Sequence, residues 1–230
     1  MQKSKRFSLT AIAVVFIFPL ALVLYTLYDN RSFGLISFIL VLLAMLPFFI
    51  HYERKKPPVR EWMPIAVMAA LAAAGRIVFA PLPHCKPTSA VIIVTAMVLG
   101  SQAGFLTGVL AALGSNLFFG QGPWTPWQMF AWGLVGFIAG VLGKRGYLHK
   151  KWQRIVFGLS SGFIYGWIMN IWTGATMAES LNITAFFYLY ITSLPTDIMH
   201  GVSTALFLLA ISDSWSAKLR RIQYRFGISY

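Results

Sequence analysis

The sequence is poor in cysteine and in acidic residues, and both shortages limit what the chain can do. Cys85 is the one cysteine in 230 residues, which excludes an internal disulfide and a cysteine-built metal site. The six Asp and Glu residues are scattered, so no pair of carboxylates on one helix face suggests acid–base catalysis. The chain also lacks a His-Glu-x-x-His motif, a Gly-x-Ser-x-Gly motif and a phosphate-binding Gly-Lys-Ser/Thr motif. We therefore expect no enzymatic activity, no ATP hydrolysis by this chain, no cofactor and no metal.

Charge of either sign is scarce, whereas long apolar runs dominate. Charged residues make up 11% of the chain against 58% hydrophobic residues, with a mean hydropathy of +0.70. A soluble domain has about 25% charged residues, and the apolar runs have the length of membrane helices. The composition predicts an all-α integral membrane protein. The runs predict eight spans, at about 8–28, 33–51, 62–80, 88–101, 105–119, 128–143, 154–173 and 187–211.

The 19 Lys and Arg residues give the orientation of these spans. Nearly all lie in four segments: before the first span, around residues 54–60, around residues 144–154 and after the last span. With eight spans, these four segments fall on the same side of the membrane. Arg31 and Lys86 lie on the other side, and Arg76 lies within a span. By the positive-inside rule both termini are cytoplasmic and the protein is multi-pass in the plasma membrane. This distribution also disfavours nucleic acid as a partner, in spite of the net charge of +13.

A charged and proline-containing stretch at residues 52–60 divides the chain. It predicts an N-terminal two-helix membrane extension over 1–57, a six-helix core over 58–212 and a basic cytoplasmic tail over 213–230. Small residues recur at helical spacing inside the core. Such rows let helix backbones approach closely in lipid. We interpret Gly104, Gly108, Ala112, Gly133, Gly136 and Gly140 as packing positions within the bundle.

An alanine row in the first core helix permits two interpretations. Ala66, Ala70 and Ala74 recur every four residues, and Ala69 and Ala73 form a parallel row. Such a face can pack inside the bundle or dock another membrane protein. The sequence alone leaves both possibilities open.

The stretch from Gly120 to Trp127 is the centre of the chain. Its two prolines prevent a helix from running straight through, so we expect a rigid turn that holds Trp124 and Trp127 at the outer face. Amides and aromatic rings surround it, which predicts a site for a flat, largely neutral organic molecule. An interfacial aromatic belt is the alternative. The predicted substrate-binding residues are His84, Lys86, Asn116, Phe119, Trp124, Trp127, Gln128, Trp132, Trp167 and Asn170.

Ionisable residues within the spans are few and therefore informative, because they are costly in lipid. Arg76, Asp197 and His200 are the intramembrane polar candidates. Arg76 and Asp197 could form an ion pair or contact a ligand directly. His200 is interpreted as a hydrogen-bonded interior residue.

Several of these segments resemble the substrate-binding S component of an energy-coupling factor (ECF) vitamin transporter. They are the alanine-rich helix ending at Gly75-Arg76-Ile-Val-Phe-Ala-Pro-Leu-Pro83, Lys86-Pro-Thr-Ser-Ala90, the stretch from Gly114 to Gln128, and the helix with Gly133, Gly136 and Gly140. The resemblance covers about residues 62–212, the predicted six-helix core. The first two helices depart from the usual pattern of the family.

The resemblance implies a subunit that binds a micronutrient outside the cell and then associates with a transmembrane coupling subunit and two cytoplasmic ATPases. Ala66, Ala70 and Ala74 would correspond to the family's docking motif for the coupling subunit. The Trp-rich turn resembles members linked with cobalamin or its precursors. His84 could then approach the corrin metal, or it could be a plain loop histidine. Riboflavin, thiamine precursors and pantothenate stay open as substrates, as does a structural or assembly subunit with no small ligand.

Overall fold

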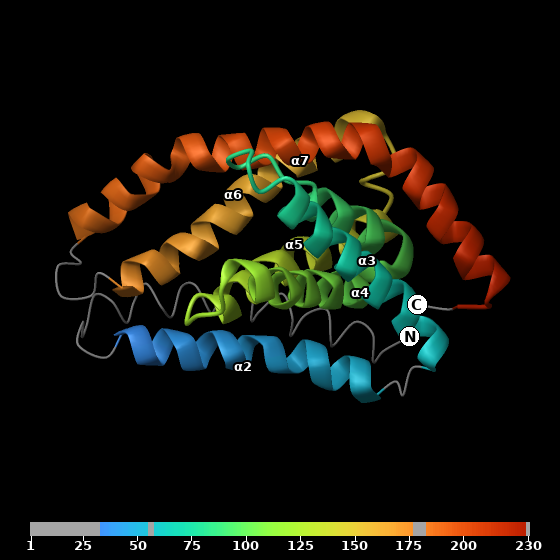
Figure 1. Cartoon of the computed structure of the whole chain (residues 1–230), viewed down its shortest axis with the longest axis horizontal. Coiled ribbons are helices and arrows are strands. Elements are labelled where there is room, and N and C mark those ends of the chain that lie inside the picture. The colour runs from blue at the N-terminus through green and yellow to red at the C-terminus, as the bar shows by residue number, and fades with distance from the viewer. Residues whose placement is uncertain (1–32, 55–57, 177–182, 229–230) are drawn as a thin grey trace.

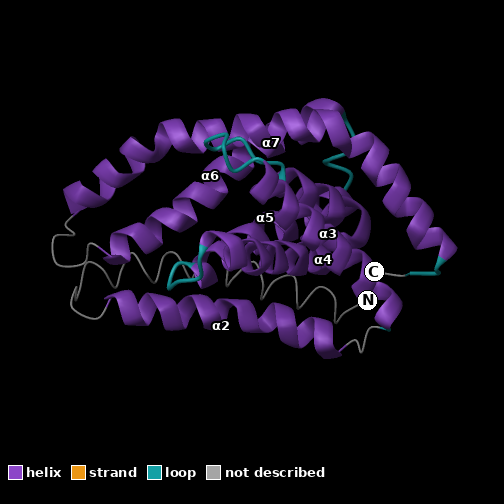
Figure 2. Cartoon of the chain, viewed as in Figure 1, coloured by secondary structure: helices purple, strands orange, loops and turns teal. Residues whose placement is uncertain are grey.

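A computed structural model of the chain describes residues 33–54, 58–176 and 183–228, and the regular structure of these residues is entirely α-helical (Figures 1 and 2). Five of the described helices, α3 to α7, are long and apolar enough to cross a membrane, which agrees with the predicted all-α membrane protein. The predicted first span, 8–28, lies outside the described residues. The helices are α2 (Phe33–Arg54), α3 (Val59–Val78), α4 (Thr88–Phe119), α5 (Thr125–Lys144), α6 (Lys151–Thr176) and α7 (Ile183–Arg225).

Helix α4 contains the two predicted spans 88–101 and 105–119, and it is sharply bent between them. Gly100 has φ 86° and ψ 174°, a backbone conformation that glycine adopts without strain. Beyond the bend, Gly104 lies so close to the side chain of Ala96 that a Cβ would have no room. Residues eight apart in a straight helix are about 12 Å apart, so the chain doubles back at Gly100. The break was expected at Gln102–Gly104 and lies slightly earlier.

The turn between α4 and α5 is shorter than the sequence predicted. Helix α4 ends at Phe119 and is followed by Gly120, with φ 95°, and α5 begins at Thr125 with Pro126 in its first turn, where a missing N–H costs nothing. The amide of Gln121 closes the turn, because its Nε2 donates to the Leu113 carbonyl and its Oε1 accepts from the Thr125 hydroxyl. The prolines therefore interrupt the helix as expected. However, Trp127 belongs to helix α5 and not to the turn.

Glycines set the distance between α4 and α5. A Cβ on Gly108 would collide with the backbone of Trp132 and Gly133, and a Cβ on Gly136 would collide with the backbone of Gly104. Gly140 lies equally close to Ser101 of α4. These contacts confirm the predicted packing role of the small residues. They also bring the polar residues of the two helices within hydrogen-bond distance.

Helix α2 lies along the bundle and contributes to its core (Figure 1). One face of α2, including Val41, Met45 and Phe48, is buried in a hydrophobic cluster with residues of α4, α5 and α6. The Phe48 ring stacks on Phe105 at a centroid distance of 3.9 Å. The opposite face of α2 is exposed at residues such as Leu43. This part of the N-terminal extension is therefore packed against the core.

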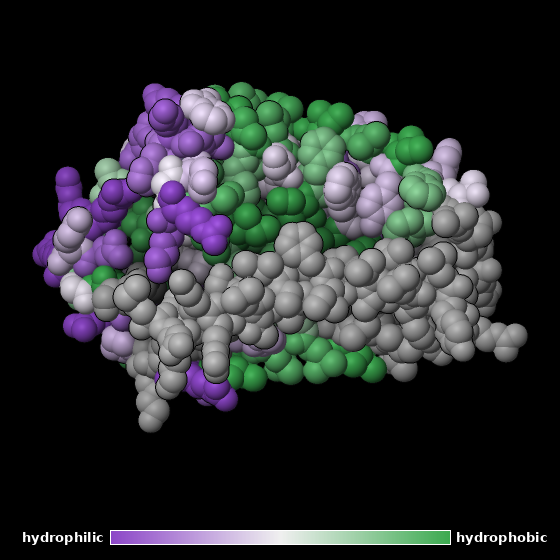
Figure 3. Space-filling view, turned by 180° about the vertical axis from the view of Figure 1, so that it is seen from behind, coloured by the Kyte–Doolittle hydropathy of each residue, from purple (hydrophilic) through white to green (hydrophobic). Residues whose placement is uncertain are grey.

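Helix α7 runs across the whole bundle and bends over the start of α3 (Figure 1). Its 43 residues span about 65 Å, more than the roughly 45 Å of a bilayer with its headgroups. Most of the predicted tail, 213–230, is thus a continuation of this helix to Arg225. Hydrophilic residues gather at the same end of the molecule (Figure 3). There Arg154 of α6 donates to Asp213 of α7 at 2.6 Å and fixes the two helices together.

Candidate functional site

Polar side chains from α3, α4, α5 and α6 form a connected and largely buried hydrogen-bond network. At its centre is Asn116, which is 1% exposed. Its Oδ1 accepts a hydrogen bond from Arg76 at 2.6 Å, and its Nδ2 donates to Gln128 at 2.8 Å. Gln128 in turn donates to the Tyr165 hydroxyl at 2.9 Å. We call this set the Asn116 network: Arg76, Ser115, Asn116, Thr125, Gln128 and Tyr165.

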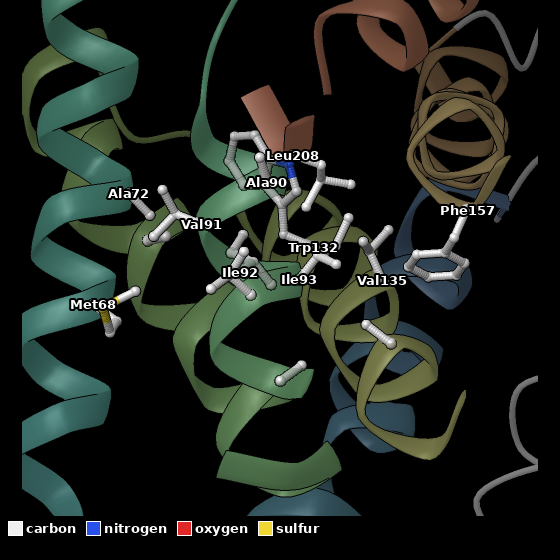
Figure 4. Packing of buried hydrophobic residues seen from close by; sticks show 14 of the residues in the cluster. Met68, Ala72, Ala90, Val91, Ile92, Ile93, Trp132, Val135, Phe157 and Leu208 are labelled. Atoms are coloured by element: carbon white, nitrogen blue, oxygen red, sulfur yellow. The ribbon is translucent and has the colours of Figure 1, made fainter. Parts of the chain in front are cut away.

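Aromatic rings extend the network toward α7. Trp132 lies one turn after Gln128 on α5, so both side chains share a helix face. The Trp132 ring stacks on Tyr165 at a centroid distance of 4.9 Å, and its Nε1 donates to Ser89 at 3.1 Å. Ser89 also forms a 2.9 Å hydrogen bond with His200 of α7. On its other side Trp132 belongs to the hydrophobic cluster that includes Ala90 and Leu208 (Figure 4).

Two cations border the network beside the Phe119 ring. The guanidinium of Arg76 lies 4.5 Å from the Phe119 centroid and 5.1 Å from the Trp132 centroid. The ammonium of Lys86 lies 5.9 Å from the Phe119 centroid. Burial lowers the pKa of Lys86, and the positive charge of Arg76 lowers this pKa further. Cation–π contacts and neutral oxygens therefore replace part of the water that these charges lose.

The structure does not form the ion pair considered for Arg76 and Asp197. Arg76 donates to Ser115 and Asn116, each at 2.6 Å. Asp197 accepts from Ser193 at 3.1 Å, and its carboxylate lies against Gly166, where no Cβ would fit. Arg76 is therefore bonded to residues of α4, whereas Asp197 accepts its hydrogen bond from Ser193 of its own helix, α7. His200 is half-buried and forms a hydrogen bond with Ser89, as expected for a hydrogen-bonded residue between helices.

Asn170 belongs to a second polar cluster between α6 and α7. Its Nδ2 donates to Ser193 at 2.7 Å, and Ser193 donates to Asp197. None of these bonds leads to the Asn116 network. Asn170 thus lies in the contact between two helices.

Three of the predicted tryptophans lie away from the Asn116 network. Trp127 is fully buried in the hydrophobic cluster that includes Phe48. Trp124 and Trp167 are 36% and 50% exposed, positions that fit the aromatic-belt alternative. Trp127 and Gln128 are adjacent along a helix and therefore point about 100° apart. This geometry explains why Gln128 joins the network and Trp127 does not.

The loop between α3 and α4 brings one of its two candidate residues to the site. The backbone N–H of Lys86 donates to Ser203 of α7 at 3.0 Å, which anchors the loop over the network. His84 is exposed and has a φ of 55°, a left-handed conformation that is uncommon for a residue other than glycine. Lys86 therefore borders the site, and His84 lies at the surface.

Sequence reasoning missed four members of the site: Ser89, Ser115, Thr125 and Tyr165. Each is a single hydroxyl side chain in or beside an apolar helix, and such residues are common at ordinary helix contacts. Thr125 carried a usable signal, because it precedes Gln128 by three residues and shares its helix face. Tyr165 carried none, because its place depends on how α6 packs against α5.

The arrangement is suited to recognition of a ring with polar edges. Amide and hydroxyl groups can exchange hydrogen bonds with such edges, and Trp132, Tyr165 and Phe119 offer ring faces. Across the described residues no three His, Cys, Asp or Glu side chains come together as a metal site would require.

The apolar helices and the buried network together define a multi-pass membrane protein with an internal polar site. Comparison with protein families narrows this class. A family described as "ECF-type riboflavin transporter, S component" matches residues 58–216. Because this match covers well over half of the chain, the chain belongs to that family. No match was found among curated proteins or among solved structures.

Membership confirms the predicted resemblance to an ECF S component. The chain is a substrate-binding membrane subunit of an ECF transporter and not an enzyme, since ATP hydrolysis is carried out by partner subunits. The comparison does not confirm the cobalamin type, because the matching family is named for riboflavin. Its substrate is a small vitamin-like molecule, and its partners are the subunits of the ECF module.

Proposed function

We propose that the Asn116 network, together with Trp132 and Phe119, binds a flat heterocyclic vitamin, with riboflavin as the first candidate. The observation that carries this proposal is the continuous set of hydrogen bonds from Arg76 through Asn116 and Gln128 to Tyr165. A stacked pair of rings, Trp132 and Tyr165, lies directly against it.

The chemistry of riboflavin matches these groups. Its ring system is flat and carries carbonyl oxygens, ring nitrogens and an imide N–H along one edge. Arg76 supplies donors to carbonyl oxygens, and Asn116 and Gln128 each supply both a donor and an acceptor. The name of the matching family supports the same substrate. Cobalamin, the substrate first predicted from the Trp-rich turn, would need a much larger opening, because its corrin ring is far wider than a flavin.

Binding would proceed by exchange of hydrogen bonds. The network's side chains satisfy one another in the structure, and an unpaired buried amide or cation is expensive. A ligand that matches both the donors and the acceptors replaces these internal bonds without leaving a group unpaired. A ligand without a polar edge would leave several groups unpaired, and this difference gives the site its specificity.

The alanine row of α3 supports a proposal for the coupling subunit. Ala66, Ala70 and Ala74 are exposed, whereas Ala69 and Ala73 are buried within the bundle. The two rows of the helix therefore have different surroundings. We propose that the exposed row contacts the transmembrane coupling subunit, because small side chains allow another membrane helix to approach closely.

A thermal-shift panel on the purified full-length chain tests the substrate. A ligand at about 100 times its Kd stabilises the folded state by about 2.7 kcal/mol, so riboflavin should raise the melting temperature. Thiamine and pantothenate should not. A shift with cobalamin and none with riboflavin would restore the cobalamin prediction. No shift with any vitamin would favour a structural or assembly subunit.

A further inference from the structure

A groove lies between residues 60–71 of α3 and the last turns of α7, and it shares no residue with the Asn116 network. Its volume is about 470 Å³, within the roughly 300–1,000 Å³ of small-molecule sites. Apolar side chains form nearly all of its wall. They include Met63, Val67 and Leu71 of α3, Trp215 and Ile222 of α7, and Phe226, which directly follows α7.

Two cations, Arg60 and Lys218, are the charged residues of this wall. Within the described residues the groove lining contains no acidic side chain. Asp213, the acidic residue of α7 nearest to Lys218 in sequence, pairs with Arg154 and Lys151, and among the described residues neither Arg60 nor Lys218 forms an ion pair. The groove therefore combines a long apolar wall with an uncompensated positive rim.

This combination is complementary to one class of molecule. We propose that the groove binds an anionic phospholipid, with an acyl chain between α3 and α7 and the phosphate between Arg60 and Lys218. The basic residues of the chain predict that this end of the bundle faces the cytoplasm, where anionic lipids are attracted to basic pockets between membrane helices. Trp215 in the groove wall supports a position of the groove at the membrane–water interface, because tryptophan is enriched there.

The site lies beside the surface proposed for the coupling subunit. On α3, Val67 and Leu71 follow Ala66 and Ala70 directly in sequence, so their faces are about 100° apart. A lipid in the groove would thus fill the space next to the alanine row. The bound lipid would stabilise the position of the last turns of α7 against α3.

Native mass spectrometry of the full-length chain, purified without partner subunits, tests this proposal. The detergent-solubilised protein is mixed with equal amounts of phosphatidylglycerol and phosphatidylcholine, and the retained lipids are counted. We expect one phosphatidylglycerol to be retained in preference to phosphatidylcholine. An Arg60→Gln and Lys218→Gln double variant should reduce this preference by about 25-fold, since each basic residue near the surface contributes about fivefold.

Two further variants make the result specific. Arg220→Gln with Arg221→Gln removes the same charge from exposed residues outside the groove and should leave the preference unchanged. Ile222→Trp keeps both cations but fills the groove, so the retained lipid should be lost. The proposal is overturned if phosphatidylcholine is retained equally well, if the control pair weakens retention as much as the groove pair, or if Ile222→Trp retains the lipid.

Discussion

The Arg76 guanidinium donates a 2.6 Å hydrogen bond to Oδ1 of Asn116 and ties the end of α3 to the end of α4. The amide nitrogen of Asn116 is used as well, for bonds to Gln128 and Thr125 of α5. One small side chain thereby orders groups from three helices. In a low-dielectric interior such a shared residue stabilises more than its individual bonds suggest.

Asn116→Leu keeps the size of the side chain and removes its amide. Arg76 and Gln128 would each lose a partner in a buried setting, so the free energy of unfolding should fall by about 2–4 kcal/mol. Denaturant unfolding followed by circular dichroism measures this loss. The neighbouring Leu117 is 79% exposed, and Leu117→Ala should change stability little. Equal stability of the two variants would show that the network is not structurally important.

Gly136→Ala tests the close crossing of α4 and α5. A Cβ at this position collides with the backbone of Gly104, which cannot move aside like a flexible side chain. We expect a loss of at least about 2 kcal/mol, as for other overpacked sites. Gly114→Ala is the matched control, because its Cβ would meet Ala73 at an ordinary 3.7 Å. In thermal unfolding, Gly136→Ala should melt at a lower temperature than Gly114→Ala. Similar melting temperatures would contradict the close approach of α4 and α5 at Gly136.

Ala70→Leu should prevent assembly with the coupling subunit and leave vitamin binding intact. The reason is that Ala70 is exposed on α3, and the added side chain would keep another helix at a distance. Ala210 is also exposed, on α7, and Ala210→Leu should assemble normally. Co-purification with a tagged coupling subunit measures assembly. Loss of vitamin binding with normal assembly would show that this alanine row serves packing within the bundle and not docking of the coupling subunit.

The lowered pKa of Lys86 predicts its chemical reactivity. A lowered pKa means that the amine loses its proton at a lower pH than usual, so more of the reactive neutral form is present near neutral pH. A bound vitamin beside Phe119 should shield this amine. Mass spectrometry after brief acetylation should show slower labelling of Lys86 with riboflavin, and unchanged labelling of the exposed Lys151. Equal rates with and without riboflavin would place the ligand elsewhere.

Much of the site followed from the sequence, because few polar residues occur within the spans. Arg76, Asn116 and Gln128 stood out for that reason, and lipid forces such groups to find one another. Gly104 and Gly136 were recognisable from helical spacing alone. The membrane class and the S-component family were likewise accessible from composition and from the quoted segments.

The remaining errors have a common physical cause, which is that the faces of a helix depend on where the helix begins. Trp127 was assigned to a turn, but α5 starts at Thr125, so Trp127 faces the core and Trp132 shares the face of Gln128. Likewise, the place of Tyr165 depends on the packing of α6. Local sequence does not determine such relations between helices.

A titration of riboflavin fluorescence against the full-length chain tests the central claim most directly. Stacking on Trp132 and Tyr165 should quench the flavin emission as the complex forms. Trp132→Phe removes the Ser89 hydrogen bond and part of the ring face, so it should weaken binding by about tenfold. Trp124→Phe and Trp167→Phe should bind like the unaltered protein. The opposite pattern, in which Trp132→Phe binds normally and the exposed tryptophans are required, would contradict the proposed site.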